Sequence, residues 1–159
     1  MHVIKSDGSV ASGRSLTNNP TRLNNAHMPN ALFDQLKFDD KGLIPLIVQD
    51  AASGQVLMMA WMNRAALDKT LEPGKVHTFS RSRGRLALKG ESSRHFQHVK
   101  EILADCDMDV VLIRVDQDVA ACHEGYRSCF YRRYDSSADS WRTIAEKVFE
   151  PDKVYSKKP

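Results

Sequence analysis

The chain has 159 residues, of which 42% are hydrophobic and 27% charged, a composition typical of one globular domain with its own core. Its formal net charge of +3 is too small to indicate a nucleic-acid-binding protein, although it suits a small anionic substrate. No apolar run reaches the roughly 20 residues of a transmembrane helix, and residues 1–16 lack the apolar core of a secretory signal, so we expect a cytoplasmic protein.

Residues 1–30 are polar, rich in Asn and Ser and without apolar periodicity, which predicts a flexible N-terminal arm ahead of one domain at 31–159. The segments GLIPLIVQD (42–50) and GQVLMMAWMN (54–63) are typical of two strands joined by a turn. Proline has no backbone N–H, so the first strand should have a free edge at Pro45 or begin after it.

The next segment, NRAALDKTLEPG (63–74), predicts a short helix. Asn63 can cap its N-terminus, and Pro73 with Gly74 ends it. Further strands are expected within 75–84, 85–107, 110–118 and 121–135, and a mixed tail follows. The fold class is therefore α+β, with mainly antiparallel β-strands and one or two helices.

Three cysteines, Cys106, Cys122 and Cys129, fall within 24 residues. An odd number argues against a disulfide framework, whereas thiolates are preferred zinc ligands. Three protein ligands would leave one tetrahedral position open, as in a catalytic zinc site. Spacing alone does not separate such a site from chance clustering.

The stretch ADCDMDVVLIRV (104–115) places three acids just before an apolar run. If the whole stretch is one strand, Asp105, Asp107 and Asp109 share a face, and Cys106 lies on the other. Three carboxylates on one face could bind a hard cation such as Mg²⁺. The alternative is a solvated edge strand whose acids face water.

His123 directly follows Cys122. Side chains of adjacent residues seldom converge on one ion, so we interpret His123 as a general acid or base beside the metal rather than as a ligand. An exposed loop histidine without a function remains the alternative.

Basic stretches occur at 81–85, 89–94 and 127–133. Arginine matches phosphate with a planar fork of donors, and the glycine and two serines of KGESS could cradle an oxyanion. Each stretch could also be an ordinary solvated surface. The candidate phosphate-binding residues are Arg81, Arg83, Lys89, Ser92, Ser93 and Arg127.

The motifs occur in an order that resembles the phosphoribosyl-AMP cyclohydrolase family. They are SRSR (80–83), KGESS (89–93), DCDMD (105–109) and CHEGYRSC (122–129). The resemblance covers about residues 42–133. It implies hydrolytic opening of the adenine ring of phosphoribosyl-AMP between N1 and C6, in histidine biosynthesis.

The resemblance also implies an intertwined homodimer with one zinc site per subunit, shared between chains. Cys106 of one chain would bind the zinc with Cys122 and Cys129 of the other. The aspartates 105, 107 and 109 would bind Mg²⁺, and His123 would take part in catalysis.

The chain departs from the family pattern at several positions. Ser92 and Phe79 are conservative, but Ala87 stands where the family usually has tryptophan, Arg94 where it has glycine, and Glu124 where it has threonine. One hypothesis is that Arg94 and Glu124 form an ion pair. Another is a change of substrate.

Three other functions stay open: a paralogue acting on another purine-like nucleotide, a non-enzymatic module stabilised by zinc, and a nucleic-acid-binding protein without a recognised motif. The family's partner activity, a pyrophosphohydrolase, is sometimes fused at the C-terminus. Some 25 residues after Arg133 are too few for that domain, so we expect it on another chain.

Overall fold

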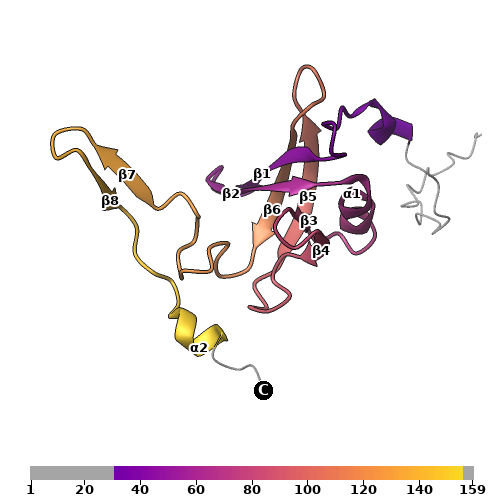
Figure 1. Cartoon of the computed structure of the whole chain (residues 1–159). Helices are drawn as coiled ribbons and strands as arrows, with labels where there is room; N and C mark the ends of the chain where they lie inside the picture. The colour runs from indigo at the N-terminus through magenta and orange to yellow at the C-terminus, as the bar shows by residue number, and fades with distance from the viewer. Residues whose placement is uncertain (1–30, 156–159) are drawn as a thin grey trace, which may run out of the picture.

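The computed structural model describes residues 31–155, and its centre is a four-stranded sheet of order β2-β1-β6-β5 (Figure 1). The strands are β1 (Ile44–Asp50), β2 (Val56–Met62), β5 (Gln97–Ala104) and β6 (Val111–Gln117). The β1–β2 and β5–β6 pairs are antiparallel, and β1–β6 is parallel. The α+β class with mainly antiparallel strands is confirmed, while the predicted arm at 1–30 lies outside the described residues.

Strand β1 alternates between buried and half-buried side chains along its whole length. Ile44, Leu46 and Val48 are fully buried, and they pack in one core with residues of β6, β2 and α1. Pro45 pairs with Trp61 of β2, but pairing with β6 begins only at Leu46. The free edge predicted at the proline is therefore confirmed.

Helix α1 (Arg64–Leu71) follows the predicted start and stop signals. The side-chain oxygen of Asn63 accepts a hydrogen bond of 2.8 Å from the amide of Ala66, which satisfies one of the free N–H groups of the first turn. The hydroxyl of Thr70 accepts the amide of His77 at 2.9 Å. This bond connects the helix to the two-stranded sheet of β3 (His77–Ser80) and β4 (Arg85–Leu88).

The segment after β6 forms the hairpin of β7 (Arg132–Asp135) and β8 (Ser140–Thr143) and the short helix α2 (Pro151–Tyr155). In Figure 1 this hairpin projects away from the four-stranded sheet, and α2 lies apart from both. Large apolar side chains are exposed along it, with Phe130 at 58% and Trp141 at 68%. A two-stranded hairpin is marginal by itself, so this segment lacks the packing that would fix it within one chain.

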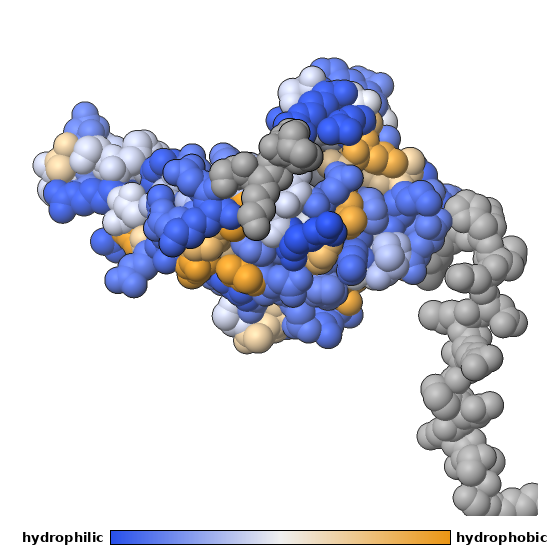
Figure 2. All heavy atoms as spheres, turned by 90° about the horizontal axis from the view of Figure 1, so that it is seen from below, coloured by the Kyte–Doolittle hydropathy of each residue, from blue (hydrophilic) through white to orange (hydrophobic). Residues whose placement is uncertain are grey.

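Apolar exposure is not confined to that hairpin. Figure 2 shows a largely hydrophilic face broken by separate hydrophobic patches. No helix within residues 31–155 is long and apolar enough to cross a membrane.

Residues 104–115 do not form one strand, and the structure instead has the separate strands expected within 85–107 and 110–118. β5 ends at Ala104 and β6 begins at Val111, and a turn connects them. The carboxylate of Asp105 accepts the amides of Asp109 at 3.0 Å and Val110 at 3.1 Å. Such side-chain bonds to nearby amides favour a turn over a strand ladder.

Candidate functional site

Two of the three cysteines meet in the loop that follows β6, residues 118–129, called here the cysteine loop. Backbone bonds close it into a hairpin: the amide of Ala121 donates to Arg127 at 3.0 Å, and that of Cys122 to Tyr126 at 3.2 Å. This hairpin brings Cys122 near enough to Cys129 to act on the pKa of the Cys129 thiol. The fold therefore brings together two ligands that are seven positions apart in the sequence.

The end of the cysteine loop is fixed to β2. The buried hydroxyl of Ser128 donates to the carbonyl of Val56 at 2.7 Å, and the amide of Cys129 donates to Leu57 at 2.7 Å. Desolvation of the Cys129 thiol and the neighbouring Cys122 raise the pKa of Cys129 to about 11. Without a cation, this thiol is neutral at pH 7, and a bound metal would displace its proton.

Lys89 lies against the same loop. Its Nζ donates a 2.6 Å hydrogen bond to the carbonyl of Ala121, and its charge interacts with Cys122 and Cys129. Burial lowers the pKa of Lys89. The residue that the sequence assigned to phosphate therefore faces the thiols, where a positive charge favours thiolate.

Cys106 is exposed in the turn between β5 and β6. Figure 1 places this turn at one end of β6 and the cysteine loop at the other. The seven residues of β6 span roughly 23 Å, so one chain does not bring Cys106 to the other two thiols. The structure thus unites two of the three predicted zinc ligands and separates the third.

The turn that carries Cys106 also carries the three predicted magnesium ligands, and residues 105–109 are called here the acidic loop. One carboxylate oxygen from each of Asp105, Asp107 and Asp109 lies within 4.8 Å of the others. They form the one group of three metal-ligating side chains found within residues 31–155. The geometry predicted from the sequence is met, although by a turn instead of a strand.

The acidic loop holds its carboxylates in unequal states. Desolvation opposes ionisation of Asp105, but hydrogen bonds from the amides of Val110 and Asp109 outweigh it and lower its pKa. Desolvation and the charges of Asp107 and Asp105 raise the pKa of Asp109. A cation bound among the three would relieve this repulsion, and carboxylate oxygens are the ligands that Mg²⁺ takes.

His123 is exposed and lines a cavity of about 640 Å³ between the cysteine loop and α2. Glu124 lines the same cavity, accepts a hydrogen bond from the hydroxyl of Tyr131 and pairs with Arg132 at 3.5 Å. The Tyr131 bond lowers the pKa of Glu124 and raises that of Tyr131 to about 12. The cavity volume is within the range of small-molecule sites.

Within one chain Glu124 pairs with Arg132 and not with Arg94. Arg94 is exposed, and its φ of 64° lies in the left-handed region. This conformation suits glycine, the residue expected from the resemblance at this position. Arg94 therefore keeps the backbone shape at a cost in strain.

The remaining candidate phosphate-binding residues lie around the β3–β4 turn and the loop after β4. Arg81 stacks over the ring of Trp61, with its guanidinium carbon 4.6 Å from the ring centre. Arg83 and Ser92 are exposed, whereas the hydroxyl of Ser93 accepts the amide of His95 at 3.2 Å. Arg81, Arg83 and Ser92 are thus accessible to a ligand.

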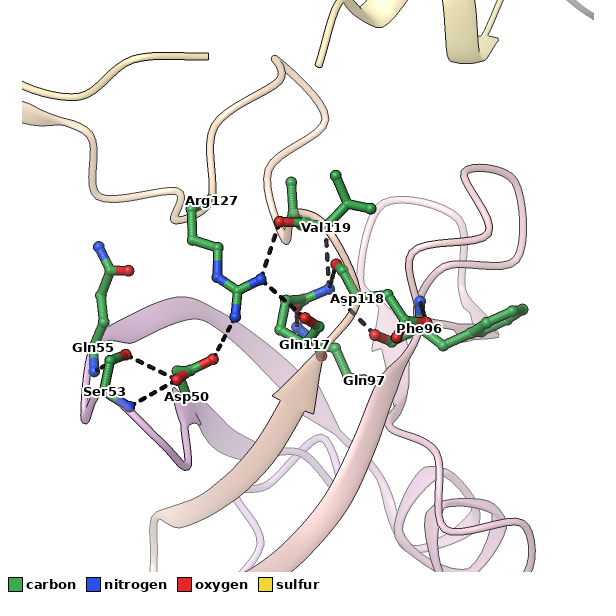
Figure 3. Close-up of polar contacts among 10 residues, drawn as sticks. Asp50, Ser53, Gln55, Phe96, Gln97, Gln117, Asp118, Val119 and Arg127 are labelled. Carbon is green, nitrogen blue, oxygen red and sulfur yellow. Dashed lines mark hydrogen bonds and ion pairs between the residues drawn. The ribbon is translucent and has the colours of Figure 1, made fainter. Parts of the chain in front are cut away.

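Arg127 is different, because its guanidinium is held by partners inside the protein (Figure 3). It pairs with the carboxylate of Asp50 at 2.6 Å and donates to the carbonyls of Gln117 and Val119. Sequence reasoning missed Asp50. The sequence did contain a sign of it. Asp50 continues the alternation of Ile44, Leu46 and Val48, so it is an acid at a position of β1 that faces the core.

Comparison with known proteins agrees with the motifs. The model of the phosphoribosyl-AMP cyclohydrolase family matches residues 58–131. A phosphoribosyl-AMP cyclohydrolase of Methanococcoides burtonii is 53% identical over 122 residues, which cover 77% of this chain and 97% of the relative. One of Methanosarcina barkeri is 56% identical over 123 residues, covering 77% and 91%.

A longer relative is the histidine biosynthesis bifunctional protein HisIE of Thermoanaerobacter pseudethanolicus. It is 53% identical over 124 residues, which cover 78% of this chain. The match spans 56% of that relative's length.

Proposed function

The chain belongs to the phosphoribosyl-AMP cyclohydrolase family, and we propose that it hydrolyses the N1–C6 bond of the adenine ring of phosphoribosyl-AMP at a thiol-bound zinc. Water adds to C6 and the ring opens at N1. The cysteine loop, which brings the Cys122 and Cys129 thiols near each other with His123 directly after Cys122, carries this proposal. A site made of free thiols requires a reducing compartment, so we place the reaction in the cytoplasm.

The donor set of the cysteine loop fits zinc. Two thiols lie near each other, desolvation disfavours the charge of Cys129, and Lys89 adds one positive charge nearby. Soft sulfur ligands select zinc over the hard cations. Zinc bound there would supply a water whose pKa lies near ~7, which makes it a nucleophile at neutral pH.

The third thiol would come from a second copy of the chain. Cys106 is exposed but lies at the far end of β6, so within one chain it is too distant to join Cys122 and Cys129. The projecting hairpin of β7 and β8 leaves Phe130, Trp141 and Ile144 exposed, a surface suited to burial against a partner. An intertwined homodimer would satisfy both features.

His123 would hold and move the proton of the reaction. Its side chain is exposed at the cavity and follows Cys122 directly, which puts an exchangeable proton beside the water's position without using the imidazole as a ligand. The N1 leaving nitrogen needs a proton as the ring opens, and protonated His123 can donate it.

Binding of the substrate would use the acidic loop and the accessible basic residues. The carboxylates of Asp105, Asp107 and Asp109 would hold Mg²⁺, which would neutralise phosphate charge on the substrate. Arg81 and Arg83 can donate to phosphate oxygens from the β3–β4 turn, and Ser92 from the following loop. These groups orient the adenine ring rather than change its bonds.

A second candidate is the same chemistry on another purine-like nucleotide. Glu124 lines the cavity beside His123, where the resemblance gives threonine. An added carboxylate would repel a phosphate placed there. Its bonds to Tyr131 and Arg132 compensate part of this charge, which favours the family substrate.

The activity is tested with zinc-loaded protein, phosphoribosyl-AMP and Mg²⁺, following ring opening by ultraviolet absorbance. We expect turnover that disappears with a zinc chelator and in the Cys129→Ala variant. Turnover of a different purine nucleotide, with none of phosphoribosyl-AMP, would support the second candidate. No turnover by folded, zinc-loaded protein would reject both.

The shared site is tested by mixing two inactive variants, Cys106→Ala and Cys129→Ala, after mild unfolding and refolding. A mixed dimer of these chains contains one intact site, so about one quarter of the wild-type sites should return. A mixture of Cys122→Ala and Cys129→Ala is the matched control, because no arrangement of those chains restores a site. Absence of recovery in the first mixture would reject a site shared between subunits.

A further inference from the structure

We propose that Arg127, Asp50 and Gln117 position the cysteine loop, and that Arg127 is not a phosphate-binding residue. These three residues are called here the loop clamp. The inference rests on the proposed function for its consequence in catalysis. Its structural part, a polar cluster that orders the loop, stands on the contacts alone.

The guanidinium of Arg127 connects three segments that are distant in sequence. Its NH2 pairs with Asp50, 77 positions earlier, at 2.6 Å, and its NH1 donates to Gln117 at 2.9 Å and to Val119 at 3.1 Å. Figure 3 shows the guanidinium between the end of β1 and the backbone that leaves β6. Arg127 lies two positions before Cys129, so the clamp acts on the part of the loop that carries a thiol.

The partner of Arg127 is built to remain ionised. Asp50 is 4% exposed, and its Oδ1 accepts the amide and the hydroxyl of Ser53, both at 2.8 Å. Those two bonds leave Oδ2 free for Arg127. Bonds from Ser53 and from Arg127 outweigh desolvation and hold the pKa of Asp50 below its usual value. A buried carboxylate without its guanidinium would be strongly unfavourable.

Gln117 fixes the other side of the clamp. Its amide nitrogen lies within hydrogen-bond distance of three carbonyl oxygens, those of Phe96 at 3.2 Å, Asp118 at 2.7 Å and Ala120 at 3.2 Å, and shares its two N–H groups among them. Its oxygen accepts the amide of buried Gln97 at 2.7 Å. The backbone at 118–120 therefore turns around a saturated side chain before it reaches Cys122.

The consequence is a preorganised pair of thiols. Arg127 holds one branch of the cysteine loop and Gln117 the other, and the Ala121–Arg127 backbone bond connects the branches. Residues that orient metal ligands in this way affect metal affinity and activity about 10–100-fold. A phosphate-binding arginine would instead act mainly on the Michaelis constant, because its contact is made with substrate in the ground state.

The test uses Arg127→Met, Arg127→Lys and Asp50→Asn in the full chain. Arg114→Met is the matched control, because Arg114 also joins two segments, pairing with Glu101 at 2.8 Å and donating to Ala51 at 2.9 Å, but does not touch the cysteine loop. Hydrogen exchange of residues 118–129 is measured in metal-free protein, zinc affinity by competition with a chromogenic chelator, and kcat and KM with phosphoribosyl-AMP.

We expect Arg127→Met and Asp50→Asn to behave alike. Both should speed exchange in the cysteine loop, weaken zinc binding about 10–100-fold and lower kcat at zinc saturation, with little change in KM. Arg127→Lys should recover part of the zinc affinity, and Arg114→Met should leave loop exchange and zinc affinity unchanged.

A different pattern would overturn the proposal. If Arg127→Met raises KM while Asp50→Asn has no effect, Arg127 binds substrate. Unchanged loop exchange in both variants would also reject the clamp. If the Met variant does not fold, Arg127→Lys and Asp50→Asn decide by the same readouts. If the wild type has no turnover, the proposed function fails, while exchange and zinc affinity still test the clamp.

Discussion

The cysteine loop and the acidic loop lie at opposite ends of β6, and the chain supports them differently. The cysteine loop is bonded to β1, β2 and β6 through Arg127 and Ser128, and Cys122 is buried. The acidic loop is a short exposed turn whose main internal bonds come from Asp105 to its own backbone.

The two loops differ in how rigidly they hold their metal-ligating side chains. Thiols in a loop that hydrogen bonds attach to three strands are fixed in place, which suits a tightly held zinc. Exposed carboxylates in a turn keep their solvation and repel one another, which suits an exchangeable hard cation. We therefore expect changes in the cysteine loop to have larger effects than matched changes in the acidic loop.

The largest expected effect is that of Cys122→Ala. Removing a thiol from the fixed pair should abolish zinc binding and lower turnover by more than about 100-fold, beyond the loss typical of residues that only orient a ligand. Zinc content after dialysis and the initial rate measure this, and circular dichroism shows whether the fold persists. Full zinc content in the variant would contradict the assignment of the site.

Asp107→Asn should have a smaller effect on the other loop. Removal of one exposed carboxylate charge about 4 Å from a divalent cation costs about 2 kcal/mol in water, so half-maximal activity should require about 30-fold more Mg²⁺. Zinc content should not change. Asp116→Asn, at the exposed position of β6, is the control and should leave the Mg²⁺ dependence unaltered. If both variants require the same increase in Mg²⁺, the acidic loop is not the Mg²⁺ site.

The loop clamp should make stability sensitive to acid through Asp50. Because its pKa is lowered in the folded state, its carboxylate adds stability above its unfolded pKa of about 3.9, and this is lost as the pH falls through the folded value. Asp50→Asn cannot ionise. Its melting temperature should lie below that of the wild type at pH 7, and the gap should narrow below about pH 4. A difference in melting temperature between the wild type and Asp50→Asn that stays constant down to pH 3 would contradict the prediction.

Opposite effects on stability are expected at two residues with positive φ, one in each loop. Val119 is exposed at φ 32°, and Met108 packs against the core at φ 67°. Val119→Gly should relieve backbone strain and stabilise the fold by at most about 1 kcal/mol. Met108→Gly should destabilise it by about 1–3 kcal/mol through lost burial. Urea unfolding measures the change in the free energy of unfolding for each variant. A loss of stability in Val119→Gly would show that the backbone at Val119 is not strained.

Local patterns predicted most of the fold. The N-cap at Asn63, the two strands joined by a turn at 42–63 and the free edge at Pro45 each depend on nearby residues, and each was confirmed. The single strand considered over 104–115 does not form, because the carboxylate of Asp105 accepts nearby amides and favours a turn there.

Of the candidate site, the sequence by itself determined the chemical types: three thiols, three neighbouring acids and a histidine beside a cysteine. Only the tertiary structure decided which of them meet. It placed Cys122 near Cys129 and Cys106 at the far end of β6. It also gave Lys89 and Arg127 partners inside the protein, the carbonyl of Ala121 and the carboxylate of Asp50. The physical reason is that a charged side chain takes whichever partner the fold brings near it. For Arg127 that partner is Asp50, 77 positions away, which no local pattern can specify.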